Sequence, residues 1–431
     1  MIWVLVVMKV SLQANFNDSN VDANQLNNQR QLEVSISVNI GQTDKNVPLN
    51  LCLVLDHSAS MNGKPLEMVK RAAIGLVDRL KEGDRLSIVA FDHRAKVLIP
   101  NQILENPEWT KQQIAYLSAD GGTAIDEGLR LGIEQLAKGK QENISQVFLL
   151  TDGENEHGDN NRCLKLAQLA ANHNLTLNAL GFGDHWNQDI LERIADTSGG
   201  TLSYIQRPDE AIEAFNRLFK RAQSIGLTNA HLLFQLMPNV RLAKLKPIAQ
   251  VSPDTIELPI QLEANGRFSV RLGDLMLDTE RVVLANLYMG KLPVGKQAIT
   301  NLQIKYSDPA QNYTGLYSEN MPVYMEVQEV YKPRLNSNVQ KSILILAKYR
   351  QTQLAEAKLQ KGDHAGAVTM LHTAAKTALQ MGDNSAATVL QTSATRLQMG
   401  EKLSETDRKR TYIVSKTILQ DFNHDINKSV N

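Results

Sequence analysis

The order of apolar and polar residues changes character along the chain. Residues 9–12 and 32–38 alternate apolar and polar side chains, as do short segments between residues 230 and 306, which is typical of strands with one solvated face. Between these regions, residues 49–220 carry apolar runs that alternate with segments of helical period. This order predicts a doubly wound α/β domain with a mostly parallel six-stranded sheet, followed by strands of a β-sandwich. From Asn336 the period is helical almost to the last residue.

The strands on the two sides of the α/β region belong together in this prediction. A two-stranded hairpin is not stable alone, so we expect the first strands to complete the later sandwich, with the α/β domain inserted into it. One strand is expected over residues 255–262, and the Asn-, Gln- and Asp-rich stretch 15–29 is expected to be a mobile loop. The predicted divisions are residues 1–47 (first strands of the sandwich), 48–222 (α/β domain), 227–332 (rest of the sandwich), 336–422 (α-helical domain) and 423–431 (tail).

A short motif recurs in the helical region. Leu-Gln-Lys-Gly-Asp ends at Asp363, Leu-Gln-Met-Gly-Asp at Asp383 and Leu-Gln-Met-Gly-Glu at Glu401. Each glycine is placed to end a helix in the left-handed conformation, and the two aspartates are placed to cap the helix that follows. The motif therefore predicts helices of about four turns joined by tight turns, that is, an array of α-helical hairpins.

Composition excludes several classes of partner. The 46 Lys and Arg residues balance the 46 Asp and Glu residues, so no net field draws the chain to nucleic acid or to an anionic membrane. No run of about 18 apolar residues predicts a membrane span, and residues 1–8 are too short for one. We expect Met8 rather than Met1 to be the natural start. The two cysteines, Cys52 and Cys163, lie in apolar segments and are expected to be buried free thiols of a cytoplasmic protein.

Candidate ligands for a metal ion follow the first apolar run of the α/β region. The run from Leu49 delivers Asp56, Ser58 and Ser60 at its end, and their spacing lets one carboxylate and two hydroxyls converge in a turning loop. Open parallel sheets bind ligands beyond the carboxyl ends of their strands. Carboxylate and hydroxyl oxygens are hard ligands, which suit Mg²⁺ or another hard divalent cation.

These residues resemble the DxSxS motif of von Willebrand factor A (vWA) domains. The other two motifs of that family are present in the right order: Thr123 stands in Asp120-Gly-Gly-Thr-Ala-Ile125, and Asp152 stands in Phe148-Leu-Leu-Thr-Asp-Gly153. The resemblance covers residues 49–221 and implies a bacterial, multidomain member of the family with an intact metal-ion-dependent adhesion site (MIDAS). The implied metal is Mg²⁺, or another divalent cation such as Mn²⁺ or Ca²⁺, held by Asp56, Ser58, Ser60, Thr123 and Asp152.

Other sites built on the same residues are open alternatives. Asp56 and the serines also suit a decayed site, in which they only cap the loop and the following helix. A haloacid-dehalogenase-type phosphatase needs a second Asp where Ser58 stands, so its proton-transfer group is missing. A Ser-His-Asp triad would combine Ser58 and Asp152 with a histidine. The candidates are His93 and His157, for which a solvated loop position is the commoner arrangement. The histidines form no HxxxH or HxH pair, which disfavours a zinc site.

The resemblance implies a protein-interaction function. We expect a non-enzymatic module whose metal ion accepts an acidic residue, Glu or Asp, from a partner protein. The alternative is an accessory subunit of an AAA+ ATPase machine such as a metal chelatase, because vWA domains also occur there. The chain has no Walker motif, so that ATPase would be a separate protein. A metal-dependent hydrolase is the third interpretation.

Overall fold

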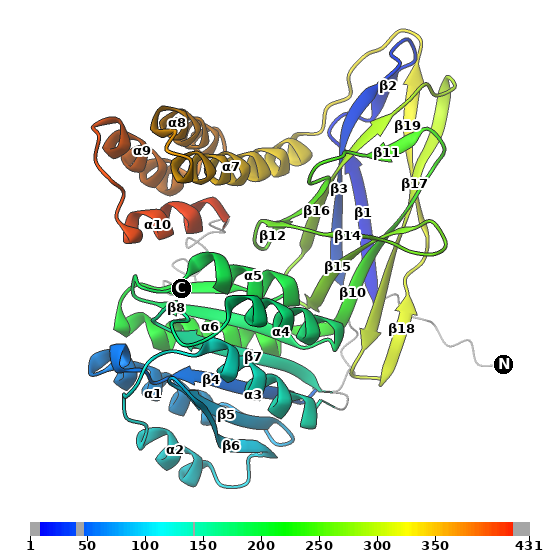
Figure 1. The fold of residues 1–431 in the computed structure, drawn as a ribbon. Helices are drawn as coiled ribbons and strands as arrows, with labels where there is room; N and C mark the ends of the chain where they lie inside the picture. Colours follow the sequence, from blue (N-terminus) through cyan, green and yellow to red (C-terminus); the bar gives the residue numbers. More distant parts are fainter. Residues whose placement is uncertain (1–8, 40–46, 141–142, 417–431) are drawn as a thin grey trace, which may run out of the picture.

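The computed structural model of the protein describes residues 9–39, 47–140 and 143–416. It consists of an α/β layer, a tall β-sandwich and a group of helices (Figure 1). The predicted start at Met8 and the predicted tail 423–431 lie outside the described residues. Within the described ranges, each helix is too short or too polar to cross a membrane.

The α/β layer is built on a six-stranded sheet. Its strands lie in the order β6-β5-β4-β7-β8-β9, and all neighbours are parallel except β5 and β6. Every residue of β4 and of β7 is buried, which accounts for their long apolar runs. The bounds are β4 (Leu49–Asp56), β5 (Arg85–Phe91), β6 (Ala95–Ile103), β7 (Ile144–Thr151), β8 (Thr176–Phe182) and β9 (Leu202–Ile205).

Helices cover both faces of this sheet. Residues of α1, α2 and α6 join one buried apolar cluster, and residues of α3, α4 and α5 join a second cluster on the other face. The two cysteines are buried free thiols of the second cluster, as the sequence predicts. The predicted doubly wound fold is confirmed, but sequence reasoning did not predict α2. The bounds are α1 (Lys64–Val77), α2 (Pro107–Ala115), α3 (Ile125–Lys138), α4 (Asn160–Asn172), α5 (Gln188–Ser198) and α6 (Ala211–Gln223).

The sandwich has two sheets, and strands from before and after the α/β layer share them. One sheet has the order β1-β3-β16-β12-β13, with β11 also paired to β16, and the other has the order β14-β15-β10-β17-β19-β2, with β18 also paired to β17. The two inner faces form one apolar core. The predicted insertion of the α/β domain into a sandwich is therefore confirmed. The bounds are β1 (Val10–Phe16), β2 (Asn20–Asp22), β3 (Asn28–Val38), β10 (Ile225–Leu236), β11 (Val240–Leu242), β12 (Ile248–Ser252), β13 (Ile256–Glu257), β14 (Ile260–Leu262), β15 (Phe268–Met276), β16 (Arg281–Met289), β17 (Gly295–Asp308), β18 (Tyr313–Tyr317) and β19 (Met321–Gln328).

Two predictions for the sandwich are wrong. The stretch 15–29, predicted as a mobile loop, contains β2 and the start of β3, because polar side chains there bond to nearby backbone. Asp18 Oδ1, for example, accepts hydrogen bonds from Asn20 N at 3.0 Å and from Arg334 N at 2.9 Å. The strand predicted over residues 255–262 is two short strands in different sheets, because Pro259 between them has no N–H to donate to a ladder.

The last described helices begin and end at the repeated Gly-Asp motif. The three motif glycines have φ angles of 77°, 78° and 82°, which is the left-handed region. Asp363 Oδ1 accepts a hydrogen bond from Gly366 N at 2.8 Å, and Asp383 Oδ1 accepts one from Ala386 N at 2.9 Å. Both predicted roles of the motif are confirmed. The bounds are α7 (Ser337–Gln360), α8 (His364–Gln380), α9 (Asn384–Gln398) and α10 (Glu405–Lys416).

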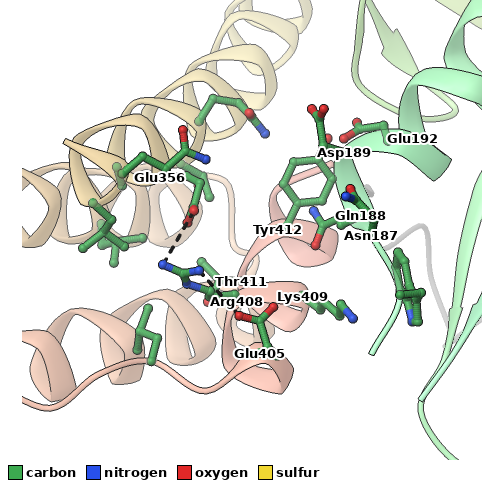
Figure 2. A pocket seen from close by; sticks show the side chains of 18 of the residues that line it. Asn187, Gln188, Asp189, Glu192, Glu356, Glu405, Arg408, Lys409, Thr411 and Tyr412 are labelled. Carbon is green, nitrogen blue, oxygen red and sulfur yellow. Dashed lines mark ion pairs between the residues drawn. The ribbon is translucent and has the colours of Figure 1, made fainter. Parts of the chain in front are cut away.

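The α/β layer is held from two sides. Near the amino ends of β7 and β8, Gln146 Nε2 and Thr176 Oγ1 donate hydrogen bonds to Asp274 Oδ2 of β15 at 2.8 Å and 2.7 Å. In the loop after β8, Asp184 Oδ2 accepts a hydrogen bond from Thr406 Oγ1 of α10 at 2.6 Å. A cavity of about 340 Å³ is lined by residues of α5, α7 and α10 (Figure 2). The carboxyl ends of the strands therefore point away from the sandwich, toward the side where α10 docks (Figure 1).

Candidate metal site

The central strand β4 delivers Asp56 to the carboxyl edge of the sheet. Its neighbours β5 and β7 are parallel to it, so the loops after these three strands meet at one edge. Asp56 is fully buried, and its Oδ1 accepts a hydrogen bond from Ser58 N at 2.8 Å. This bond turns the chain directly after the strand, just before the short 3-10 helix Ala59–Met61.

A chain of hydroxyls links this loop to the loop after β7. Ser58 Oγ and Ser60 Oγ lie 3.0 Å apart, and Ser60 Oγ donates a hydrogen bond to Asp152 Oδ1 at 2.7 Å. Ser58 is buried and Ser60 is exposed, so the chain runs from the sheet edge toward solvent. Together with Asp56, the structure thus brings together four of the five residues predicted from the sequence.

The loop that carries Thr123 lies against both other loops. Ala59 N donates a hydrogen bond to Gly121 O at 2.9 Å, and His157 N donates one to Thr123 O at 3.0 Å. Thr123 is buried, and a Cβ atom on Gly153 would lie 3.0 Å from Thr123 Oγ1. The fifth predicted residue therefore lies beside the other four, with its hydroxyl next to the glycine of the Thr-Asp-Gly motif.

Sequence reasoning missed two residues that support this arrangement. Thr151 Oγ1 donates a hydrogen bond to Asp56 Oδ2 at 2.6 Å, which orients the carboxylate. Asn155 Oδ1 accepts a hydrogen bond from Ile125 N at 2.6 Å and so ties the loop after β7 to the first turn of α3. Thr151 stands inside a recognised motif, but no sequence pattern pairs it with a residue 95 positions away.

The site concentrates negative charge. Burial raises the pKa of Asp56 to about 6; hydrogen bonds from Thr151 and Ser58 oppose this shift, and the charge of Asp152 adds to it. Burial also raises the pKa of Asp152, against the hydrogen bond from Ser60. Among the described residues, no lysine or arginine forms an ion pair with either carboxylate. Keeping these carboxylates charged away from water costs free energy, and a cation bound here would offset that cost.

The geometry distinguishes between the alternatives raised by the sequence. Ser58 Oγ is hydrogen-bonded to a serine, and over the described ranges no hydrogen bond joins it to His93 or His157. The His157 ring instead lies beside the loop that carries Thr123. A Cβ atom on Gly122 of that loop would be 2.0 Å from His157 Cδ2. In the part of the chain that the structure describes, no group of three or more His, Cys, Asp or Glu side chains is arranged to hold a metal ion. Two carboxylates and three hydroxyls form an oxygen-only set, which fits a hard divalent cation.

The fold of this layer defines the class of the protein: it contains a vWA domain. The family model described as von Willebrand factor type A domain matches residues 50–217. A second model, Sll0103-like, C-terminal alpha-helical domain, matches residues 337–421. The chain belongs to the Sll0103-like family. It is 57% identical over 413 residues to "Uncharacterized protein sll0103" of Synechocystis sp., an alignment that covers 96% of this chain and 98% of that relative.

More distant proteins share the vWA domain or the fold. Inter-alpha-trypsin inhibitor heavy chain H4 of Bos taurus is 30% identical over 176 residues, which cover 38% of this chain and 19% of that protein. The structure of a von Willebrand factor type A protein from Catenulispora acidiphila superposes with a TM-score of 0.80 at 18% identity, over 96% of this chain and 98% of its own. The ArnB paralog VWA2 from Sulfolobus acidocaldarius gives a TM-score of 0.57 at 13% identity, over 95% and 98%. These two structures show a shared fold alone.

Proposed function

We propose that the chain is a protein-interaction module. Its vWA domain holds Mg²⁺, or another divalent cation such as Mn²⁺ or Ca²⁺, between the loops that carry Asp56, Thr123 and Asp152, which we call the metal edge. The cation in turn binds a carboxylate of a partner protein. The observation that carries the proposal is the hydroxyl chain from Ser58 through Ser60 to Asp152, beside a buried Asp56 that forms no ion pair with a lysine or arginine among the described residues. Two carboxylates supply the charge that a dication requires, and the hydroxyls, with that of Thr123, supply neutral ligands.

The protein's own groups account for orientation and selectivity in this proposal. Thr151 and the Ser58 N–H fix the Asp56 carboxylate. Asn155 holds the loop that carries Thr123 and the loop after β7 together. The bound cation would supply Lewis acidity toward an anionic oxygen. Because three of the five ligating groups are neutral, the site favours an incoming Glu or Asp side chain. The same geometry supports a non-enzymatic role, since Ser58 is hydrogen-bonded to another hydroxyl rather than to a base.

Thermal unfolding tests the metal site. The loops converge only in the folded chain, so a cation stabilises it by mass action, by about 2.7 kcal/mol at a hundredfold excess over its Kd. We expect a higher Tm in Mg²⁺ or Mn²⁺ than in EDTA. Asp56→Asn, which keeps the shape and loses the charge, should remove this dependence. Glu156→Gln, at an exposed position in the loop that carries Asp152, should keep the dependence of Tm on the cation. An identical Tm of the unsubstituted protein in all three media would contradict the proposal.

Affinity capture tests the partner. The unsubstituted chain and Thr123→Ala serve as baits in Mg²⁺ and in EDTA, and the retained proteins are identified. We expect a protein that is retained in Mg²⁺ and whose binding weakens at least tenfold, about 1.4 kcal/mol, with EDTA or with Thr123→Ala. Retention of an AAA+ ATPase that ignores both treatments would instead favour the accessory-subunit function. Undiminished binding of every partner would place the interface outside the metal edge.

A further inference from the structure

One side of the β-sandwich ends in very short strands. In one sheet these are β11 and β13, and in the other the last strand is β14, which pairs only with β15 among the described strands. The chain passes through Pro259 from β13 in one sheet to β14 in the other. An edge strand has a row of backbone groups available to another extended chain.

A groove of about 890 Å³ lies between these two edges. Its lining is largely apolar and includes Leu236, Leu242, Leu258, Ile260, Leu262 and Phe268. Ile260 and Leu262 are two apart on β14, so they share one face of that strand. Leu262 is 68% exposed, and Leu245 in the loop beside the groove is 86% exposed. Exposed apolar surface gathered at a groove is typical of a binding site for another molecule.

The rim of this groove is basic. Arg241, Lys244 and Lys246 line it, and all three are exposed. The acidic residue in the lining, Glu257, is already paired, because both of its carboxylate oxygens accept hydrogen bonds from Arg350 at 2.8 Å and 3.0 Å. Three positive charges thus face a groove whose carboxylate is neutralised, so its electrostatic complement is an acidic ligand.

We propose that this groove binds an extended segment of a partner protein in which apolar residues alternate with Asp or Glu. Side chains of a strand point alternately to opposite faces, so such a segment can place its apolar residues in the groove while its carboxylates meet the basic rim. Its backbone pairs with the free edge of β14. The interface is separate from the metal edge, because the groove lies in the sandwich and contains none of the five site residues.

Three fluorescein-labelled peptides of about eight residues, the length of an ordinary strand, provide the probe. One alternates Val and Glu, one has the same composition in two blocks, and one alternates Val and Lys. Fluorescence anisotropy on the full chain should show saturable binding of the first peptide and at least tenfold weaker binding of the other two. EDTA should leave this binding unchanged, so it does not depend on the proposed metal site.

Two variants locate the binding. The double substitution Lys244→Glu with Lys246→Glu should weaken binding of the alternating Val-Glu peptide at least tenfold. The matched pair Lys361→Glu with Lys402→Glu, which changes the net charge equally at exposed turns of the helical domain, should not. Leu262→Asn should also weaken binding while leaving the melting curve in place.

Three results of the anisotropy experiments would overturn the proposal: equal binding of all three peptides, absence of binding, or equal affinity in the two charge variants. A self-associated chain in sedimentation, dissociated by Leu262→Asn, would show that a second copy fills the groove and would also overturn it.

Discussion

Asp56 accepts a hydrogen bond from a side chain outside the predicted ligand set, and this bond helps to orient the carboxylate at the metal edge. The donor is Thr151 Oγ1, and both residues are fully buried. Burial penalises a carboxylate, whereas a hydrogen bond to a charged group recovers about 1.5–3 kcal/mol. Together with the Ser58 N–H, a residue that we do not expect to touch the cation therefore fixes the orientation of Asp56.

Replacement of Thr151 tests this dependence. Thr151→Val keeps the shape but has no donor, so we expect it to lower the free energy of unfolding of the metal-free protein by about 1.5–3 kcal/mol. Thr151→Ser keeps the donor and should cost less than half as much. Urea denaturation in EDTA measures both. If the two variants are equally stable, the hydrogen bond contributes nothing to the fold.

At this scale the sequence reveals chemistry only where it is local. Asp56, Ser58 and Ser60 stand within one short pattern, and Thr123 and Asp152 each stand in a pattern of their own, so all five could be predicted. The hydrogen bond of Thr151 joins two strands, and that of Asn155 joins two loops. Such contacts depend on the register of the folded sheet, which no local pattern records.

Among the elements, two helix caps that look alike in sequence have different surroundings. Asp363 Oδ2 contacts Lys358 Nζ at 2.6 Å, where both side chains are substantially exposed. Asp383 Oδ2 contacts Lys348 Nζ at 2.9 Å, and the Lys348 side chain is fully buried. The same ammonium donates a hydrogen bond to Val414 O at 2.7 Å. Asp383 therefore caps α9 and pairs with a buried lysine of α7 that also contacts α10, whereas Asp363 caps α8 and pairs with an exposed lysine of α7.

The two caps should therefore differ in their contribution to stability. Asp383→Ala removes the carboxylate partner of a buried ammonium, so we expect the free energy of unfolding to fall by about 3–5 kcal/mol. Asp363→Ala removes a cap and an exposed ion pair, and its loss should be clearly smaller. Chemical denaturation of the two variants side by side provides the measurement. Equal losses would show that the buried ion pair adds nothing beyond helix capping.

Most elements with a clear period were predicted, whereas most of the short ones were not. The buried strands of the α/β layer and the amphipathic helices carry enough residues to show a period of 2 or about 3.6. The strands β2, β11, β13 and β18 have two to five residues each, too few for any period to appear. They form because a neighbouring strand or a turn places them at a sheet edge, which is information from the whole fold.

In the whole molecule, α10 connects the helical domain to the loop after β8, on the same side of the sheet as the metal edge. Lys409 Nζ donates a hydrogen bond to Asp184 O and lies 4.1 Å from the centroid of the Trp186 ring, both in the loop after β8. On the cavity side, Arg408 pairs with Glu356 at 3.9 Å and with Glu405 at 3.5 Å (Figure 2). The contacts of Lys409 with Asp184 and of Arg408 with Glu356 join residues far apart in the chain, so domain docking could not be predicted from the sequence.

A charge cluster around the buried Lys416 completes this docking. Lys416 Nζ lies 2.6 Å from Glu192 Oε1 and 2.8 Å from Asp196 Oδ1. Burial opposes the charge on Lys416, but the two carboxylates outweigh it and raise the pKa of the ammonium. Burial raises the pKa of Glu192 to about 7; the charge of Lys416 opposes this shift and that of Asp196 adds to it. Other titratable groups that face the cluster are Asp189, Asp254 and Tyr349.

One buried ammonium facing two partly buried carboxylates makes the docked state favour an extra proton, and this predicts how stability depends on pH. The pKa of Glu192 rises from its ordinary value of 4.5 to about 7 on folding, so between these values the folded chain binds more protons than the unfolded chain. The contribution of this group is fully present below about pH 4.5 and is lost as the pH rises through about 7. We therefore expect the free energy of unfolding to fall across this interval.

Glu192→Gln should make this fall in stability with pH less steep, because its amide does not titrate. Glu213→Gln, which removes an exposed carboxylate of α6, should keep it. Urea denaturation across the interval decides the matter: equal slopes in the two variants would show that the cluster holds no extra proton.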